Sequence, residues 1–170
     1  MKSLPSLARR TLLGLSLVAT LGACTTTGPM PSLMQQLDNT MRQSAPDRRV
    51  RLQLGTETLK VGDTLAVQAR SAQPGYLYLF QLSSDGRELN LVFPNSIDGA
   101  NYVGAGQPAD LPRPTWRLRA KGPTGVGYLM AVVTQEQQDL LALPARLKEG
   151  QIALVGPYAA AMAPLREVAP

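Results

Sequence analysis

The sequence predicts a mainly β protein: a two-sheet antiparallel β-sandwich of Ig-like general architecture with a short N-terminal helix. Three observations favour this fold. From Val50 onward, apolar and polar residues alternate with the two-residue period of β-strands. Turn signals rich in Gly, Pro, Asn and Asp separate these runs at hairpin-like intervals. The 14 prolines and 15 glycines suit short strands better than long helices. A small β-barrel is the alternative that this pattern leaves open.

The first 24 residues resemble the export signal of a bacterial lipoprotein. A basic start is followed by an apolar run at residues 11–20 (TLLGLSLVAT) and then by Leu21-Gly22-Ala23-Cys24. These last four residues are similar to a lipobox, so we expect residues 1–23 to be removed and Cys24 to carry lipid. A transmembrane anchor would need about 20 apolar residues. An ordinary secretory signal would leave an odd cysteine without a role.

A lipid on Cys24 would also define where the protein resides. Buried acyl chains, at about 0.8 kcal/mol per CH₂, hold a protein on a membrane, and several together do so almost permanently. The next residue is Thr25, whereas an Asp there tends to retain enterobacterial lipoproteins in the inner membrane. By that analogy we expect the periplasmic face of the outer membrane, with the inner membrane as the alternative. Residues 24–31 are small, polar and contain Pro and Gly, which is typical of a flexible tether.

Residues 32–48 are predicted to form a short helix and a linker. Ser32 is a suitable N-cap, because its hydroxyl can accept from a free N–H in the first turn. The apolar residues that follow fall on one helical face. These residues are Leu33, Met34, Leu37 and Met41. A helix packed on the domain is the simpler expectation, and a helix that binds a partner is the alternative.

Residues 49–156 are predicted to form the β-sandwich domain. The expected strands lie at residues 50–54, 59–61, 65–69, 76–82, 88–93, 116–121, 128–133 and 152–155. The nearly continuous apolar run at 76–82 indicates a central strand that is covered on both faces. Residues 96–114 are predicted to be a long excursion with few ladder hydrogen bonds, and residues 135–143 are mildly helical in pattern. Residues 157–170, rich in Ala and Pro, are predicted to be a loosely packed tail.

Composition excludes several functional classes. The chain contains no His, which removes the Ser–His–Asp and Cys–His nucleophile systems and the commonest neutral metal ligand. The formal charge of +5 falls to +2 in the mature chain, because the signal holds three of the 17 basic residues. A charge that small gives little attraction for nucleic acid. No carboxylate lies inside an apolar run, as a glycosidase acid would require. We therefore predict a non-enzyme with no catalytic residues, no metal and no cofactor.

An ordered series of short motifs runs through the predicted domain. The motifs are Val61-Gly62-Asp63, Gly75-Tyr76-Leu77-Tyr78-Leu79, Asp85-Gly86, Val92-Phe93-Pro94-Asn95, Ala105-Gly106, Leu111-Pro112 and Gly122-Pro123-Thr124-Gly125. Over roughly residues 59–135 this series resembles an uncharacterised bacterial family, one of the "domain of unknown function" series. Such domains are attached to caspase-like peptidases, to Ser/Thr kinases and to envelope proteins. The resemblance implies an accessory or interaction module and supplies no catalytic residue.

Two sets of side chains are candidates for a binding surface. The basic set falls largely on one side of a predicted strand and would suit anionic lipid, peptidoglycan or an acidic partner. It consists of Arg113, Arg117, Arg119 and Lys121. A solvated strand face or a protected sheet edge explains the same charges. The aromatic set, Tyr76 and Tyr78, would suit stacking on sugar or peptide, but core packing is the interpretation that we favour.

Oxygen-bearing side chains gather in the long excursion. They are Asn95, Asp98, Asn101 and Asp110. Such ligands suit Ca²⁺, but their order does not follow an EF-hand, and Asn and Asp are the usual turn formers. The turn interpretation is the one that we favour.

Three hypotheses for function follow. The preferred one is a lipid-anchored periplasmic module that binds another envelope protein, such as a component of a secretion or surface-assembly system. The alternative is a peptidoglycan- or glycan-binding lipoprotein that uses the Arg113–Lys121 face. The third, least favoured, is a metal-dependent hydrolase that uses the Asn/Asp excursion. The sequence leaves the oligomeric state open.

Overall fold

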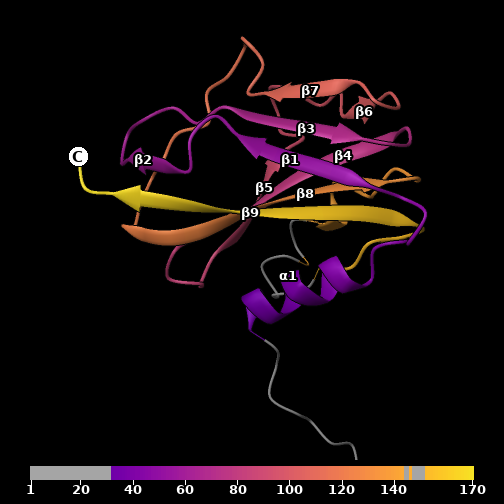
Figure 1. The fold of residues 1–170 in the computed structure, drawn as a ribbon, viewed down its shortest axis with the longest axis horizontal. Coiled ribbons are helices and arrows are strands. Elements are labelled where there is room, and N and C mark those ends of the chain that lie inside the picture. The colour runs from indigo at the N-terminus through magenta and orange to yellow at the C-terminus, as the bar shows by residue number, and fades with distance from the viewer. Residues whose placement is uncertain (1–31, 144–145, 147–151) are drawn as a thin grey trace, which may run out of the picture.

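The computed structural model describes residues 32–143, 146 and 152–170. The predicted signal, Cys24 and the predicted tether lie outside these residues. Within them, an N-terminal helix and two sheets are stacked in layers (Figure 1). The elements are α1 (Leu33–Arg42), β1 (Val50–Leu54), β2 (Thr58–Lys60), β3 (Val67–Ser71), β4 (Gly75–Leu82), β5 (Leu89–Phe93), β6 (Tyr102–Val103), β7 (Pro108–Leu111), β8 (Gly125–Thr134) and β9 (Tyr158–Val168).

The sandwich predicted from the alternating pattern is confirmed. A small sheet has the strand order β1-β3-β7, and a large sheet has the order β2-β9-β8-β4-β5, with β6 paired to the start of β4. The pairs are antiparallel except for β2 and β9, which run parallel. Because β2 and β9 lie far apart in sequence, this pair joins the two ends of the domain.

Two hydrophobic cores hold the layers together. The first lies between the sheets and contains, for example, Val67 of β3, Leu79 of β4 and Ala131 of β8. The second lies on the other face of the large sheet, where Phe80 and Val132 pack beneath α1 and the segment after β8. The large sheet is therefore buried on both faces, as the apolar run at 76–82 predicts, and β4 and β8 include fully buried residues on either side.

Helix α1 forms where the sequence predicts it. The Ser32 side chain accepts from the Gln35 amide, and the Gln35 side chain accepts in return from the Ser32 amide, which is a complete capping box. Leu37 is wholly buried at the centre of the apolar face, and Met34 and Met41 pack beside it. The Tyr158 hydroxyl also donates to the Thr40 carbonyl at 3.1 Å. The helix is therefore packed on the domain, as expected.

The prediction of a loose C-terminal tail is wrong. Residues 158–168 form β9, an 11-residue strand that lies between β2 and β8 in the large sheet. The Ala-rich sequence has weak intrinsic strand preference, but the ladder on each side supplies hydrogen bonds that propensity does not register. The only proline inside the strand, Pro164, lies opposite Tyr128.

Three other predicted segments differ from the structure. Residues 152–155 form no strand; Ile152 and Leu154 instead pack against the second core. Residues 116–121 keep the predicted alternation of buried and exposed side chains but form only an isolated bridge, Thr64 with Arg119. The excursion at 96–114 contains the short strands β6 and β7, and β7 becomes one edge of the small sheet.

Candidate binding face

The outer face of the small sheet carries several exposed arginine side chains. Arg51 and Gln53 of β1 alternate with residues that point into the core, and Gln68 and Arg70 do the same in β3. The register pairs Arg51 with Arg70 and Gln53 with Gln68. Arg49 precedes β1 on the same side, because the Ala72 amide donates to its carbonyl and continues the ladder. We call the outer surface around Arg49, Arg51, Arg70 and Arg117 the arginine face.

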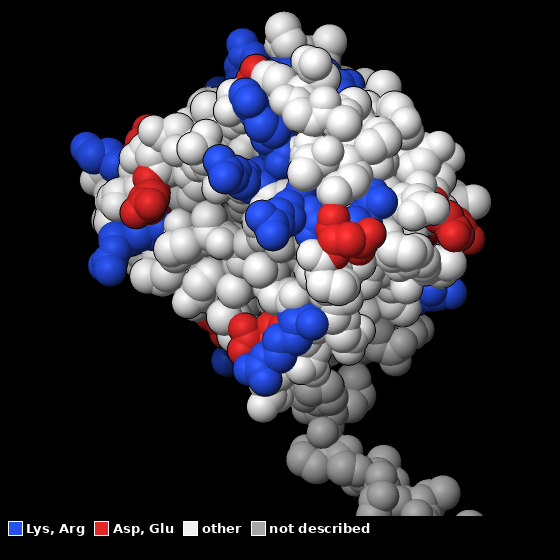
Figure 2. Space-filling view, turned by 45° about the vertical axis from the view of Figure 1, so that its right-hand side comes forward, with Lys and Arg blue, Asp and Glu red and all other residues white. Residues whose placement is uncertain are grey.

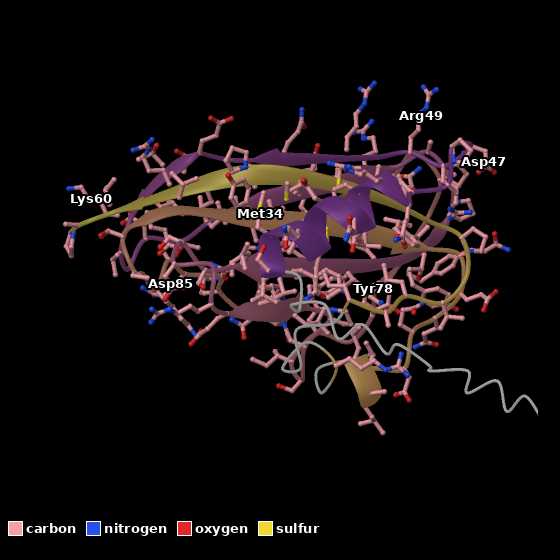
Figure 3. The ribbon with its side chains drawn as sticks, turned by 90° about the horizontal axis from the view of Figure 1, so that it is seen from below. Met34, Asp47, Arg49, Lys60, Tyr78 and Asp85 are labelled. Atoms are coloured by element: carbon pink, nitrogen blue, oxygen red, sulfur yellow. The ribbon has the colours of Figure 1, made fainter. Side chains whose placement is uncertain are left out.

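The pair Arg51 and Arg70 places two like charges directly opposite each other. Side chains at such positions have Cβ atoms about 5 Å apart, and like charges there are destabilising. Both residues are exposed, and neither guanidinium forms an ion pair or hydrogen bond with the described part of the chain. A run of basic side chains crosses the middle of the molecular face in Figure 2. Arg49 points outward at one end of the domain (Figure 3).

Two adjoining hollows form a groove across this face. One, of about 220 Å³, is lined by Arg51, Gln53, Gln68 and Arg70. The other, of about 600 Å³, shares Gln53 and Gln68 with the first and extends to Arg117. The groove therefore runs from the arginine pair, past the two glutamines, to a third guanidinium.

The groove has few acidic groups of its own. Asp110 of β7 lines the larger hollow, and its carboxylate accepts from the Gln68 side-chain amide at 2.7 Å. This bond fixes the Gln68 amide between the arginine pair and Asp110. The Gln53 side chain forms no hydrogen bond with the described residues. The groove thus offers an unpaired amide and three unpaired or weakly engaged guanidinium groups.

In the structure, the four residues of the predicted basic set do not lie on one surface. Arg117 lines the groove, and its guanidinium donates to the Pro114 and Trp116 carbonyls. Arg119 is exposed and donates to the Gly62 carbonyl at 3.2 Å, and Lys121 is exposed. Arg113 is not part of this surface, because it is only partly exposed and is engaged elsewhere. The predicted four-residue face is therefore incorrect as a unit.

Arg113 belongs to a structural cluster around the predicted Phe-Pro-Asn turn. Its guanidinium pairs with the Asp98 carboxylate and donates to the Ala100 carbonyl. It also lies 5.3 Å from the centre of the Phe93 ring. The other Asp98 oxygen accepts from the Trp116 indole N–H at 3.0 Å, and Trp116 is stacked parallel to Phe93. This cluster ties the excursion to the core.

Three of the four Asn and Asp residues predicted in the excursion, Asn95, Asp98 and Asn101, are turn and packing residues, whereas Asp110 lies in β7 and lines the groove. The Asn95 side-chain oxygen accepts from the backbone amides of Ile97 and Asp98, and the side-chain NH₂ of Asn101 donates to the Leu77 carbonyl. Asp98 is committed to Arg113 and Trp116. Among the described residues, no group of three or more His, Cys, Asp and Glu side chains could hold a metal ion.

The two tyrosines of the candidate aromatic surface, Tyr76 and Tyr78, lie in different environments. Tyr78 is wholly buried, and its hydroxyl accepts from the Gln138 amide at 2.8 Å. Tyr76 is partly exposed and meets Tyr102 of β6 edge to face, with ring centres 5.2 Å apart. Tyr102 is 60% exposed. Tyr78 therefore packs in the core, as the favoured interpretation predicts, and only Tyr76 of the candidate aromatic surface is partly exposed. The exposed Tyr102 lies in the excursion, where the sequence predicts no strand.

Shifted pKa values occur away from the arginine face. Hydrogen bonds from the Ser83 hydroxyl and the Arg87 amide lower the pKa of Asp85, which closes the β4–β5 turn. Bonds from two backbone amides lower the pKa of Asp139. Burial raises the pKa of the Tyr158 phenol. These groups stabilise turns and the α1 contact, and the arrangement provides no acid–base pair at the groove.

The fold and this face define a β-sandwich module with a basic, polar groove on one outer sheet. A family model described as "Domain of unknown function (DUF4384)" matches residues 58–137. This match supports the resemblance to an uncharacterised domain family, over almost the same residues as the motif series. It spans β2 to β8 and leaves α1, β1 and β9 outside.

The matched residues include two glycines at which strands approach closely. A Cβ at Gly75 would overlap the Thr134 carbonyl oxygen, and one at Gly127 would overlap that of Leu82. Both lie where β4 and β8 are adjacent.

No curated protein matches the chain. No helix in the described part of the chain is long and apolar enough to cross a bilayer.

Proposed function

We propose that this protein is a non-enzymatic, lipid-anchored interaction module of the periplasm that binds an envelope protein through the arginine face. The observation that carries the proposal is the position of that face. The small sheet is the layer farthest from α1, with the large sheet between them (Figure 1). The chain enters the described domain at Ser32, at the start of α1.

The proposed anchor relates the position of the arginine face to that of the membrane. If lipid is attached to Cys24, the eight residues 24–31 span at most about 28 Å before the helix begins. The anchor would then attach on the α1 side, and the arginine face lies on the layer away from that attachment point. A patch that served only to hold anionic lipid of the same membrane would be better placed next to the anchor.

Two measurements test the proposal. The first is palmitate labelling of the full-length protein and of a Cys24→Ser variant, followed by membrane fractionation. We expect label and membrane association in the first protein only. The second is in-cell photo-crosslinking from position 53, at the centre of the groove, with position 87 in the β4–β5 turn as the matched surface control. We expect a discrete protein adduct from position 53 alone.

Either result can overturn the proposal. An unlabelled protein whose fractionation is unaffected by Cys24→Ser would remove the anchored module. Equal adducts from positions 53 and 87, or none from either, would remove the protein partner at this face.

The alternative, a peptidoglycan- or glycan-binding lipoprotein, is favoured by one observation. Unpaired guanidinium groups also suit the carboxylates of an anionic polymer. A pull-down with purified sacculi, compared with an Arg117→Glu variant, distinguishes it. Binding that depends on Arg117 would favour this alternative, and binding that is unaffected by the reversal would remove it.

A further inference from the structure

We infer that the arginine face binds an extended acidic segment of a protein, with one carboxylate bridging the guanidinium groups of Arg51 and Arg70. This inference rests on the proposed function and specifies its partner by chemistry. It follows from three features: the like-charge pair, the neighbouring amides and the spacing of both along the strands.

The like-charge pair is the centre of the site. Arg51 and Arg70 are register partners, both line the smaller hollow, and neither pairs with a carboxylate of the described chain. A carboxylate placed between them would accept hydrogen bonds from both and would replace repulsion with two charge-assisted contacts. The nearest acidic side chain of the groove, Asp110, is already bonded to Gln68 on the other side of β3.

The spacing along the face matches that of an extended peptide. Arg49, Arg51 and Gln53 are separated by two residues each along one strand direction, which is a repeat of about 6.6 Å. Alternate side chains of an extended peptide have the same repeat. A peptide lying along the groove can therefore direct successive acidic side chains to Arg49 and to the Arg51–Arg70 pair.

The glutamines favour a peptide over a glycan or a lipid headgroup. Each side-chain amide can donate and accept, as the peptide backbone requires. The residues that line the smaller hollow include no aromatic ring for stacking on a sugar. Tyr78 and Trp116 are buried, and Tyr76 pairs with Tyr102 on β4 and β6. The position of the face, on the layer opposite α1, disfavours lipid.

A binding measurement with the full-length protein in detergent tests this inference. The probe is a fluorescein-labelled peptide in which Glu alternates with Ser, and its matched control has Gln in place of Glu. Fluorescence anisotropy reports binding at low and high salt. We expect the Glu peptide to bind, the Gln peptide not to bind, and affinity to fall as salt rises.

Variants assign the binding to the face. The double variant Arg51→Gln/Arg70→Gln is expected to weaken binding by about tenfold or more, equivalent to about 1.4 kcal/mol. The matched control, Lys60→Gln/Arg87→Gln, removes the same charge elsewhere, and Lys60 lies at the opposite end of the domain from Arg49 (Figure 3). It is expected to change affinity less than about twofold. Thermal unfolding of both variants verifies that they fold.

Each of the following outcomes would overturn the inference, the proposed function or both. Equal weakening by the two double variants would mean attraction by net charge alone and would overturn the inference. Competition by vesicles of anionic phospholipid or by sacculus fragments that is as strong as by unlabelled Glu peptide would also overturn it. If position 53 captures a protein in cells while the Glu peptide does not bind, this inference fails and the proposed function stands. If both fail, the proposed function falls as well.

Discussion

The repulsion between Arg51 and Arg70 should be measurable as a loss of stability. Replacing Arg70 with Gln removes one charge of a cross-strand pair that no carboxylate of the described chain neutralises. With guanidinium groups about 7 Å apart in a dielectric near that of water, Coulomb's law gives about 0.6 kcal/mol. This value falls in the range of about 0.2–1 kcal/mol expected for cross-strand pairs. We therefore expect Arg70→Gln to raise the free energy of unfolding by about 0.5 kcal/mol.

The assay is urea unfolding followed by the fluorescence of Trp116, the only tryptophan of the chain. A gain of this size corresponds to an increase in Tm of about 1–3 °C. Arg70→Lys, which keeps the charge, should give no gain. In a background of Arg51→Gln, the gain from Arg70→Gln should disappear, and at about 1 M salt, where charges are screened within about 3 Å, it should disappear in the parent as well. A gain that persists without Arg51, or at high salt, would refute the reasoning.

Three further predictions concern the rest of the fold. Asp98→Ala should destabilise the domain by about 2–3 kcal/mol in urea unfolding, because Arg113 and the indole N–H of Trp116 lose their shared acceptor; Asp98→Asn should cost less, and equal stability of all three proteins would contradict the cluster. A chain that ends at Gly156 lacks β9 and should show no cooperative unfolding transition by circular dichroism, whereas retention of a sharp transition would show that β9 is dispensable. Burial raises the pKa of Tyr158 above its ordinary value of 10.0, so the stability contributed by its neutral phenol is present below pH 10 and is lost as pH rises through the folded-state pKa. Stability should therefore fall more steeply above pH 10 in the parent than in Tyr158→Phe, and parallel pH profiles would contradict this.

The local sequence pattern predicts those strands and the helix that are buried on one face or on both faces. The alternation at residues 50–54 and the apolar run at 76–82 each specify a strand and its buried side without reference to distant residues. The Ser32 capping signal likewise predicts the start of α1. In each case the local preference and the final environment agree, so the pattern is sufficient.

The remaining errors arose where long-range pairing decides the structure. Strand β9 is stabilised by ladders to β2 and β8, and its Ala-rich sequence gives no local sign of them. The arginine face also depends on long-range strand pairing. Arg51 and Arg70 each appear in the sequence as ordinary outward residues, and only the register of β1 with β3 places them opposite each other. The sequence groups Arg113 with the other basic residues because its partner, Asp98, is 15 residues away along the chain.

The position of β9 has a consequence for how the domain is made. Both of its neighbours, β8 and β2, precede it in the chain, and β2 precedes it by roughly a hundred residues. Until the segment that forms β9 is available to pair, β2 and β8 each have an unpaired edge. Unpaired edges of this kind recruit other strands and promote aggregation. Efficient production should therefore depend on a holding chaperone during the interval before β9 is available.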